Sequence, residues 1–268
     1  MPKLFLLGID GLPRWMWQQF ADSGVMPNSK SLLDSGTLVP MKSAMPEVSS
    51  AAWASIVTGE DSGGHNVYGF TDLIDGSYTL AFTSSRTFRA KPFWQREGSG
   101  PSLIMNVPQT YPAQPLDGML VSGFVALDLM KAVYPAEQLP WLEDHDYSVD
   151  ADMSLIEKGK SEFVAELHKV MRIRCEALHH HWDRNRFWPR TFTCAPVLRV
   201  HRLARPGVVF GLGPCELDVE RSNRTVWTGS VGDCALLAAS GAFDVGLGGG
   251  GSSWSFGRCS MVVTRSRL

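Results

Sequence analysis

The sequence predicts an α/β fold in which a mainly parallel sheet is flanked by helices. Apolar runs of strand length alternate with amphipathic stretches through the first 175 residues, and that alternation is typical of β–α–β units. The first run, residues 3–9, is apolar without interruption, as expected of a strand buried on both faces. Glycine and proline mark the boundaries between runs. The pattern fades in the last third of the chain, where we expect irregular structure and an incomplete sheet.

Local signals then place each element in chain order. The expected strands are residues 3–9, 37–42, 102–107 and 119–122. The expected helices are residues 15–23, 28–34, 49–57 and 154–178. Pro27 suits the start of the second helix, and Gly59 suits the end of the third. Ser154 and Glu157 have the spacing of a capping box, which predicts the start of the longest helix.

Composition and charge exclude several classes of function. Hydrophobic residues make up 44% of the 268 residues, which is enough for a sizeable core. The formal net charge of −2 gives no reason to expect nucleic-acid binding. No apolar run approaches the roughly 18 residues of a membrane span, and no export signal precedes the first strand. We therefore expect a cytoplasmic protein without a membrane partner, whose five cysteines are thiols.

The composition changes near residue 175. Eight lysines, six isoleucines and five tyrosines all precede that position, whereas all five cysteines lie at or beyond it. A GC-rich gene translated in a shifted frame loses the first three residue types, and we favour that interpretation over a genuine second domain rich in Arg and Gly. The sequence is therefore divided into a domain over residues 1–175 and an unassigned tail over residues 176–268, either out of frame or disordered.

Two residues are the strongest candidates for chemistry. Asp10 ends the first strand between Gly8 and Gly11, where a carboxylate can hold a divalent cation, although it can equally cap the next turn. Ser49 opens the helix expected over residues 49–57. A hydroxyl there meets unpaired N–H groups, an environment that binds phosphate and favours a nucleophile. The structural alternative for Ser49 is an ordinary N-cap.

Two further polar residues are weaker candidates for substrate binding. His65 lies in a glycine-containing loop, where most histidines form surface or hydrogen-bonding contacts. Asn106 ends the strand before Pro108 and can donate to a bound anion, or else satisfy the backbone of the next turn.

Four segments in order resemble the type I phosphodiesterase/nucleotide pyrophosphatase family of the alkaline phosphatase superfamily. They are Leu7-Gly8-Ile9-Asp10-Gly11, Met26-Pro27-Asn28 with Leu32 to Gly36, Met45-Pro46-Glu47-Val48-Ser49 with Thr58-Gly59 and His65, and Asn106-Val107-Pro108-Gln109-Thr110-Tyr111-Pro112 with Val121-Ser122-Gly123-Phe124. The resemblance covers about two-thirds of the chain and implies an alkaline-phosphatase-like sheet.

The resemblance also implies a mechanism. The family uses two divalent metal ions, usually zinc, and a Thr or Ser nucleophile that forms a covalent intermediate with phosphorus. Asp10 matches the first metal ligand, and Ser49 matches the nucleophile. A small-molecule phosphate ester or nucleotide is the implied substrate. Asn66 stands where a glycine is common after the histidine.

The tail departs from the family pattern. The family draws its remaining metal ligands from an Asp-x-x-x-His segment and a later Asp-His-Gly segment, and the tail contains no Asp-His-Gly. The metal ions are therefore only partly liganded by the residues that match. Three hypotheses remain open from the sequence: a metal-dependent phosphohydrolase, an inactive truncated or frame-disrupted remnant, and a non-catalytic anion-binding module.

Overall fold

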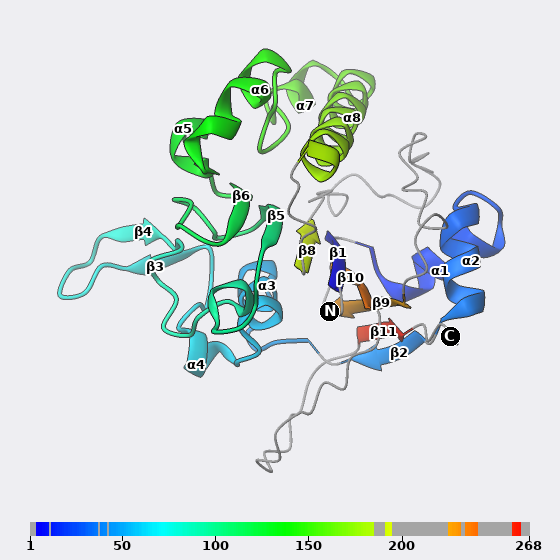
Figure 1. Ribbon diagram of the computed structural model, residues 1–268, viewed down its shortest axis with the longest axis horizontal. Coiled ribbons are helices and arrows are strands. Elements are labelled where there is room, and N and C mark those ends of the chain that lie inside the picture. The colour runs from blue at the N-terminus through cyan, green and yellow to red at the C-terminus, as the bar shows by residue number, and fades with distance from the viewer. Residues whose placement is uncertain are drawn as a thin grey trace, which may run out of the picture.

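A computed structural model describes residues 4–10, 12–36, 38–41, 43–184, 191–194, 225–231, 234–240 and 259–263. Its main element is a nine-stranded sheet in the order β2-β11-β9-β10-β1-β8-β5-β6-β7 (Figure 1). These strands are β1 (Leu4–Asp10), β2 (Leu38–Met41), β5 (Ser102–Val107), β6 (Gly118–Ser122), β7 (Val133–Tyr134), β8 (Thr191–Cys194), β9 (Thr225–Val231), β10 (Cys234–Ser240) and β11 (Cys259–Val263).

The sheet has a parallel part and an antiparallel part. Strands β1, β8, β5 and β6 run parallel to one another, whereas β7 pairs antiparallel with β6. From β1 toward the other edge, β10, β9, β11 and β2 pair antiparallel. The predicted α/β architecture is thus confirmed. The parallel part includes β1 and β5, the strands that carry the predicted site residues Asp10 and Asn106.

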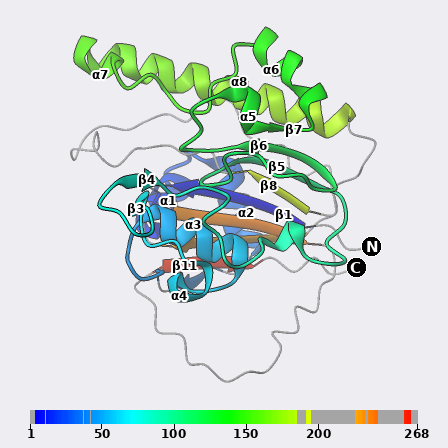
Figure 2. The same cartoon turned by 90° about the vertical axis from the view of Figure 1, so that its left-hand side faces the viewer.

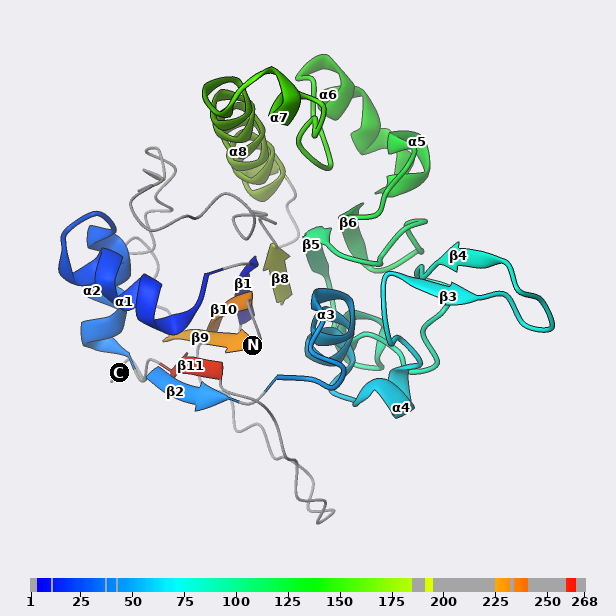
Figure 3. The ribbon, with the colours of Figure 1, turned by 180° about the vertical axis from the view of Figure 1, so that it is seen from behind.

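Helices cover both faces of the sheet. They are α1 (Arg14–Asp22), α2 (Pro27–Ser35), α3 (Ser49–Thr58), α4 (Ser62–His65), α5 (Leu129–Ala132), α6 (Leu139–Asp144), α7 (Leu155–Lys158) and α8 (Lys160–Arg184), with short 3-10 turns at Phe93–Gln95 and Ala136–Gln138. Figure 2 faces the side that α3 and α4 cover. Figure 3 shows α1, α2 and α8 on the opposite side, and a separate hairpin of β3 (Thr71–Leu73) and β4 (Leu80–Phe82).

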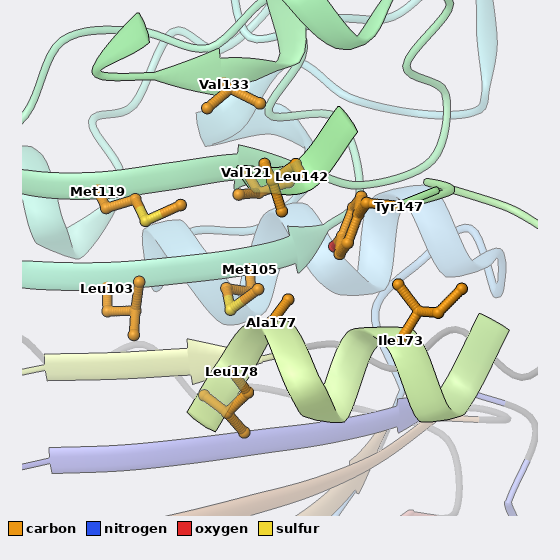
Figure 4. Packing of buried hydrophobic residues seen from close by; sticks show 10 residues of the cluster. All are labelled: Leu103, Met105, Met119, Val121, Val133, Leu142, Tyr147, Ile173, Ala177 and Leu178. Carbon is orange, nitrogen blue, oxygen red and sulfur yellow. The ribbon is translucent and has the colours of Figure 1, made fainter. Parts of the chain in front are cut away.

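Alternation along the strands sorts the core into two layers. Leu103 and Met105 of β5 pack toward α8, together with residues of β6 (Figure 4). Ile104, between them in sequence, packs on the other face against Trp53 of α3. Successive side chains of a strand point to opposite faces, so a single strand supplies both layers. On β1 the same alternation sends Leu7 and Ile9 toward the face of α1 and α2.

Most predicted elements are present, with two differences. The strand expected over residues 102–107 has those bounds, and the others agree within one or two residues at each end. The helix expected over residues 154–178 is divided at Gly159, whose φ of 155° no helix accommodates. Ser154 precedes α7 but makes no side-chain cap bond, so the capping-box prediction was wrong.

The tail contributes strands to the sheet. Strand β8 lies between β1 and β5, and β9, β10 and β11 extend the sheet beyond β1. The rest of the region in which the sequence predicts irregular structure lies outside the described residues, apart from the end of α8. Cys175 is disulfide-bonded, which differs from the expectation of free thiols. Disulfides are typical of oxidising compartments and rare in the cytosol. This bond therefore gives the expected cytoplasmic location no support, and that location stays a prediction.

Within the described ranges, the helices are too short or too polar for a transmembrane segment.

Candidate active site

Asp10 and Ser49 come together at the carboxyl edge of the parallel strands. Asp10 is the last residue of β1, and Ser49 is the first residue of α3. The Ser49 hydroxyl donates a hydrogen bond to Oδ1 of Asp10 over 3.3 Å. Both residues are half-buried, so the pair is reachable from solvent. The two strongest candidates of the sequence analysis, 39 residues apart in the chain, therefore form one site.

A close contact between α3 and β1 sets this geometry. Trp53 follows Ser49 by one helical turn and is fully buried. Its indole lies so near Gly8 that a Cβ atom at Gly8 would be 2.0 Å from Cη2 of Trp53. Residues four apart lie on the same face of a helix, so the face that carries Trp53 also carries Ser49. Because Gly8 has no side chain, α3 can approach β1 closely enough for Ser49 to meet Asp10.

The first turn of α3 is not capped by a side chain. The N-cap position is Val48, and Ser49 already lies inside the helix, so the alternative of Ser49 as an N-cap was wrong. The first-turn N–H groups lack intrahelical partners and carry the positive end of the helix dipole. The hydroxyl of Ser49 is thus held beside a carboxylate at a position that favours negative charge.

His65 ends α4 and makes a different pair. Its ring is fully buried, with Nε2 3.0 Å from the Ser55 hydroxyl and Nδ1 accepting from the backbone N–H of Val67 over 3.1 Å. Since Nδ1 is an acceptor, Nε2 carries the proton of the neutral ring and donates to Ser55. Burial lowers the pKa of His65, and the charge of Asp61 opposes that shift without overcoming it. His65 joins α4 to α3 and does not contact Asp10 or Ser49.

The departure at Asn66 has a physical explanation. Asn66 has a φ of 64° and a ψ of 28°, the left-handed conformation that follows α4. Glycine adopts this conformation without cost, and asparagine is the residue that tolerates it next best. The substitution therefore keeps the turn that presents His65.

Asn106 lies at the same edge of the sheet but on the other face. A bulge between Met105 and Val107 gives Asn106 a φ of 58°, and its Oδ1 accepts a hydrogen bond from the Tyr147 hydroxyl. Among the described residues its Nδ2 has no partner, although the side chain is buried. Strand β8 separates β5 from β1, and two steps of about 4.8 Å therefore lie between the strands. The structure does not bring Asn106 into contact with Asp10 or Ser49.

Comparison with known proteins assigns the family. The model of the type I phosphodiesterase / nucleotide pyrophosphatase family matches residues 4–174, more than half of the chain. The chain belongs to this family. The match spans both residues of the Ser49–Asp10 pair and ends close to the change in composition. No curated protein matches the sequence significantly.

Solved structures share the fold. Phosphonoacetate hydrolase from Sinorhizobium meliloti 1021, in complex with phosphonoformate, superposes with a TM-score of 0.51 at 15% identity. Its complex with phosphonoacetate gives the same values. The alignment covers 78% of the present chain and 49% of the hydrolase, so the chain spans about half the length of that neighbour. At this identity the similarity shows the fold alone, an alkaline-phosphatase-like arrangement.

The site fits a metal ion of this family only in part. Asp10 and Ser49 offer two oxygen atoms, 3.3 Å apart, of the kind that coordinate divalent cations. In the part of the chain that the structure describes, no three His, Cys, Asp or Glu side chains form a group that could hold a metal. A protein zinc site normally takes about three or four protein ligands. Among the described residues, the Ser49–Asp10 pair alone therefore falls short of a zinc site.

Two supporting residues were missed by the sequence analysis. The first is Trp53 of α3, which lies against Gly8. A glycine inside an apolar strand is the signal that could have indicated such a close approach. The second is Tyr147, whose hydroxyl donates a hydrogen bond to the side-chain amide of Asn106. It lies between helices in a segment without apolar periodicity. No sequence pattern pointed to it.

Proposed function

We propose that the chain is a metal-dependent phosphohydrolase of the phosphodiesterase/nucleotide pyrophosphatase type with Ser49 as its nucleophile. The hydrogen bond from Ser49 to Asp10, formed at an uncapped helix N-terminus, carries this proposal. Its substrate is a small-molecule phosphate ester or nucleotide. The phosphonate ligands of the structural neighbour, each carrying a phosphorus oxyanion, are consistent with that class.

The chemistry assigned to Ser49 is a substitution at phosphorus. The Ser49 oxygen forms a bond to phosphorus, the bond from phosphorus to the leaving oxygen breaks, and the hydroxyl proton passes by way of Asp10 to the leaving oxygen. Water then cleaves the serine–phosphorus bond and returns a proton to the serine oxygen. The first-turn N–H groups of α3 stabilise negative charge on the transferred group.

Asp10 and Ser49 are the residues that would hold a metal ion. Two divalent ions, with zinc as the expected element, would favour ionisation of the hydroxyl and neutralise charge on the transferred group. The other protein ligands would come from outside the described residues. His65 and Asn106, each buried away from the Ser49–Asp10 pair, are assigned no direct part in bond making. Asn106 remains a proposed donor to substrate through its Nδ2 atom.

The direct test is turnover by the full chain loaded with Zn²⁺. The chain should hydrolyse bis(p-nitrophenyl) phosphate, and Ser49→Ala should reduce kcat by about 1,000-fold or more. Ser55→Ala is the matched control on the same helix and should retain the rate within about threefold. Absence of turnover by the folded, metal-loaded chain would contradict the proposal.

A non-catalytic anion-binding module is the second candidate. The observation in its favour is that, among the described residues, no three His, Cys, Asp or Glu side chains form a group that includes Asp10. The uncapped N-terminus of α3 can hold an anion without any metal. Thermal stabilisation by inorganic phosphate without hydrolysis would support this candidate over the enzyme.

The tail bears on whether the site is complete. The alternative to an active enzyme is a remnant whose catalytic domain matches residues 1–175 and whose written sequence leaves its original frame near that point. Resequencing the gene across codons 170–190 tests this. Asp-x-x-x-His and Asp-His-Gly segments in another downstream frame would support the frame-disrupted remnant. A single open frame, as written, would contradict it.

A further inference from the structure

The hairpin formed by β3 and β4 is an apolar arm that none of the described elements covers. We define the arm as residues 68–83. Every residue of both strands is exposed. Large apolar side chains that are at least half exposed occur along its whole length: Tyr68, Leu73, Ile74, Tyr78, Leu80 and Phe82. Single exposed apolar residues are normal on a protein surface, but a concentrated group of this kind indicates an interaction site.

Strand register gives the arm an apolar face. Leu73 pairs with Leu80, and Thr71 pairs with Phe82. Residues two apart lie on the same face of a strand, so these four side chains share one face. The intervening pair, Asp72 with Ala81, lies on the other face. The arm is therefore an amphipathic ribbon whose uncharged face meets solvent.

The base of the arm is fixed to the body of the protein. Thr83 donates from its hydroxyl to the carbonyl of Gly69 over 2.9 Å, and Gln109 donates from Nε2 to the Thr83 hydroxyl over 3.0 Å. Phe70 packs edge-on against Phe124, with ring centroids 5.4 Å apart. Beyond this anchor the ribbon stands away from the sheet (Figures 1 and 3). The apolar face is held outward instead of folding back onto the core.

We propose that this arm is a self-association surface that pairs with the arm of a second copy of the chain. The six apolar side chains expose on the order of 700 Å², taking about 200 Å² for a whole large side chain. That area approaches the roughly 800 Å² per partner of a standard protein interface. The face formed by Thr71, Leu73, Leu80 and Phe82 can meet the same face of a second copy about a twofold axis.

Charge favours a second copy over other partners. The arm contains no Lys or Arg, and its charged residues are Asp72 and Asp75. Anionic membranes and nucleic acids would be repelled by these carboxylates. The apolar face itself carries no charge, so two identical faces can meet without like charges opposing each other directly. Neither Ser49 nor Asp10 takes part, so the inference does not depend on the proposed activity.

Sedimentation equilibrium of the full chain tests the proposal. The wild-type chain should associate to a dimer as concentration rises, and the double variant Leu80→Asp/Phe82→Asp should weaken association by about 100-fold or more. Met130→Asp, a substitution of an equally exposed apolar residue outside the arm, is the matched control and should leave the dimer unchanged. The double variant should melt at an unchanged temperature at dilutions where the wild type is monomeric, because these side chains are largely exposed in the monomer.

Three outcomes would overturn the proposal. The first is a wild-type chain that stays monomeric at all accessible concentrations. The second is a dimer that the arm variant retains. The third is binding of the arm to neutral lipid vesicles without self-association, which would assign the apolar face to a membrane surface.

Discussion

Helix α3 carries two serine hydroxyls that each bond to an ionisable side chain, and the two pairs differ in what they can do. Ser49 meets Asp10 at the first turn, where both residues are half-buried. Ser55 meets His65 further along the helix, where the imidazole is fully buried. Access to solvent and an uncapped helix end make the first pair suited to chemistry. The second pair, in which the imidazole alone is closed from solvent, joins two helices. Residue type alone does not separate the two roles.

After loss of the Ser49 hydroxyl itself, the largest expected effect comes from removing the charge of the first pair. Asp10→Asn keeps the shape of the side chain but removes the carboxylate that accepts from Ser49. We expect kcat of the zinc-loaded chain to fall by about 100-fold or more, with the melting temperature nearly unchanged. Steady-state kinetics and thermal unfolding measure the two effects. If Asp10→Asn kept the wild-type kcat, the Ser49–Asp10 pair would be no better suited to catalysis than the Ser55–His65 pair.

The contact that positions the first pair should be the next most sensitive. Gly8→Ala places a methyl group within the indole of Trp53, so α3 must move away from β1. Overpacking of this kind typically costs about 1–3 kcal/mol, and kcat should fall along with it because Ser49 moves with the helix. Chemical denaturation measures the loss of stability.

Gly69→Ala is the matched control for that substitution. A Cβ atom at Gly69 would meet its nearest atom at 3.4 Å, an ordinary contact, so both stability and kcat should stay close to wild type. Equal effects of the two substitutions would indicate that the approach of α3 to β1 is not what sets the site.

Breaking the hydrogen bond between Ser55 and His65 should lower the free energy of unfolding and leave kcat nearly unchanged. Ser55→Ala leaves the Nε2–H of His65 without its partner in a buried environment. An unsatisfied buried donor costs about 1–3 kcal/mol in the free energy of unfolding. Denaturation of Ser55→Ala should show this loss while kcat stays within about threefold of wild type. A large fall in kcat without loss of stability would place His65 in the catalytic machinery.

The smallest expected effect is a dependence of stability on pH. Burial lowers the folded-state pKa of His65 below the ordinary value of 6.5, so the unfolded chain binds the extra proton first. The contribution of neutral His65 is therefore complete above about pH 6.5 and is lost as the pH falls below that value. Urea unfolding between pH 8 and pH 5 should show this loss, and His65→Gln should lessen it.

The sequence predicted the elements that carry the site better than it predicted the contacts between them. The apolar run before Asp10 and the boundaries around Ser49 were strong local signals, and both residues lie where the motifs indicated. Their meeting depends on α3 lying against β1, a tertiary contact that only the glycine at position 8 hinted at. The same limit applies to Asn106, whose direction is set by a bulge that no local pattern announces.

The hairpin arm and α4 were not predicted, for a different reason. The strands of the arm have three residues each and bury none of them, so they lack the alternation of buried and exposed positions that identifies a strand. Helix α4 has four residues, two of them glycine, and is fixed by the side chain of Asp61 accepting from the N–H of Gly64. Elements this short leave little periodicity in a sequence.

Mass spectrometry of the trapped reaction tests the central assignment most directly. The full chain, loaded with Zn²⁺ and mixed with a phosphodiester, would be quenched in acid and digested. The account predicts that the peptide containing Ser49 gains the mass of the transferred phosphoryl ester at that residue, and that Ser49→Ala gains none. Turnover that leaves Ser49 unmodified, or that labels Ser55 instead, would contradict it.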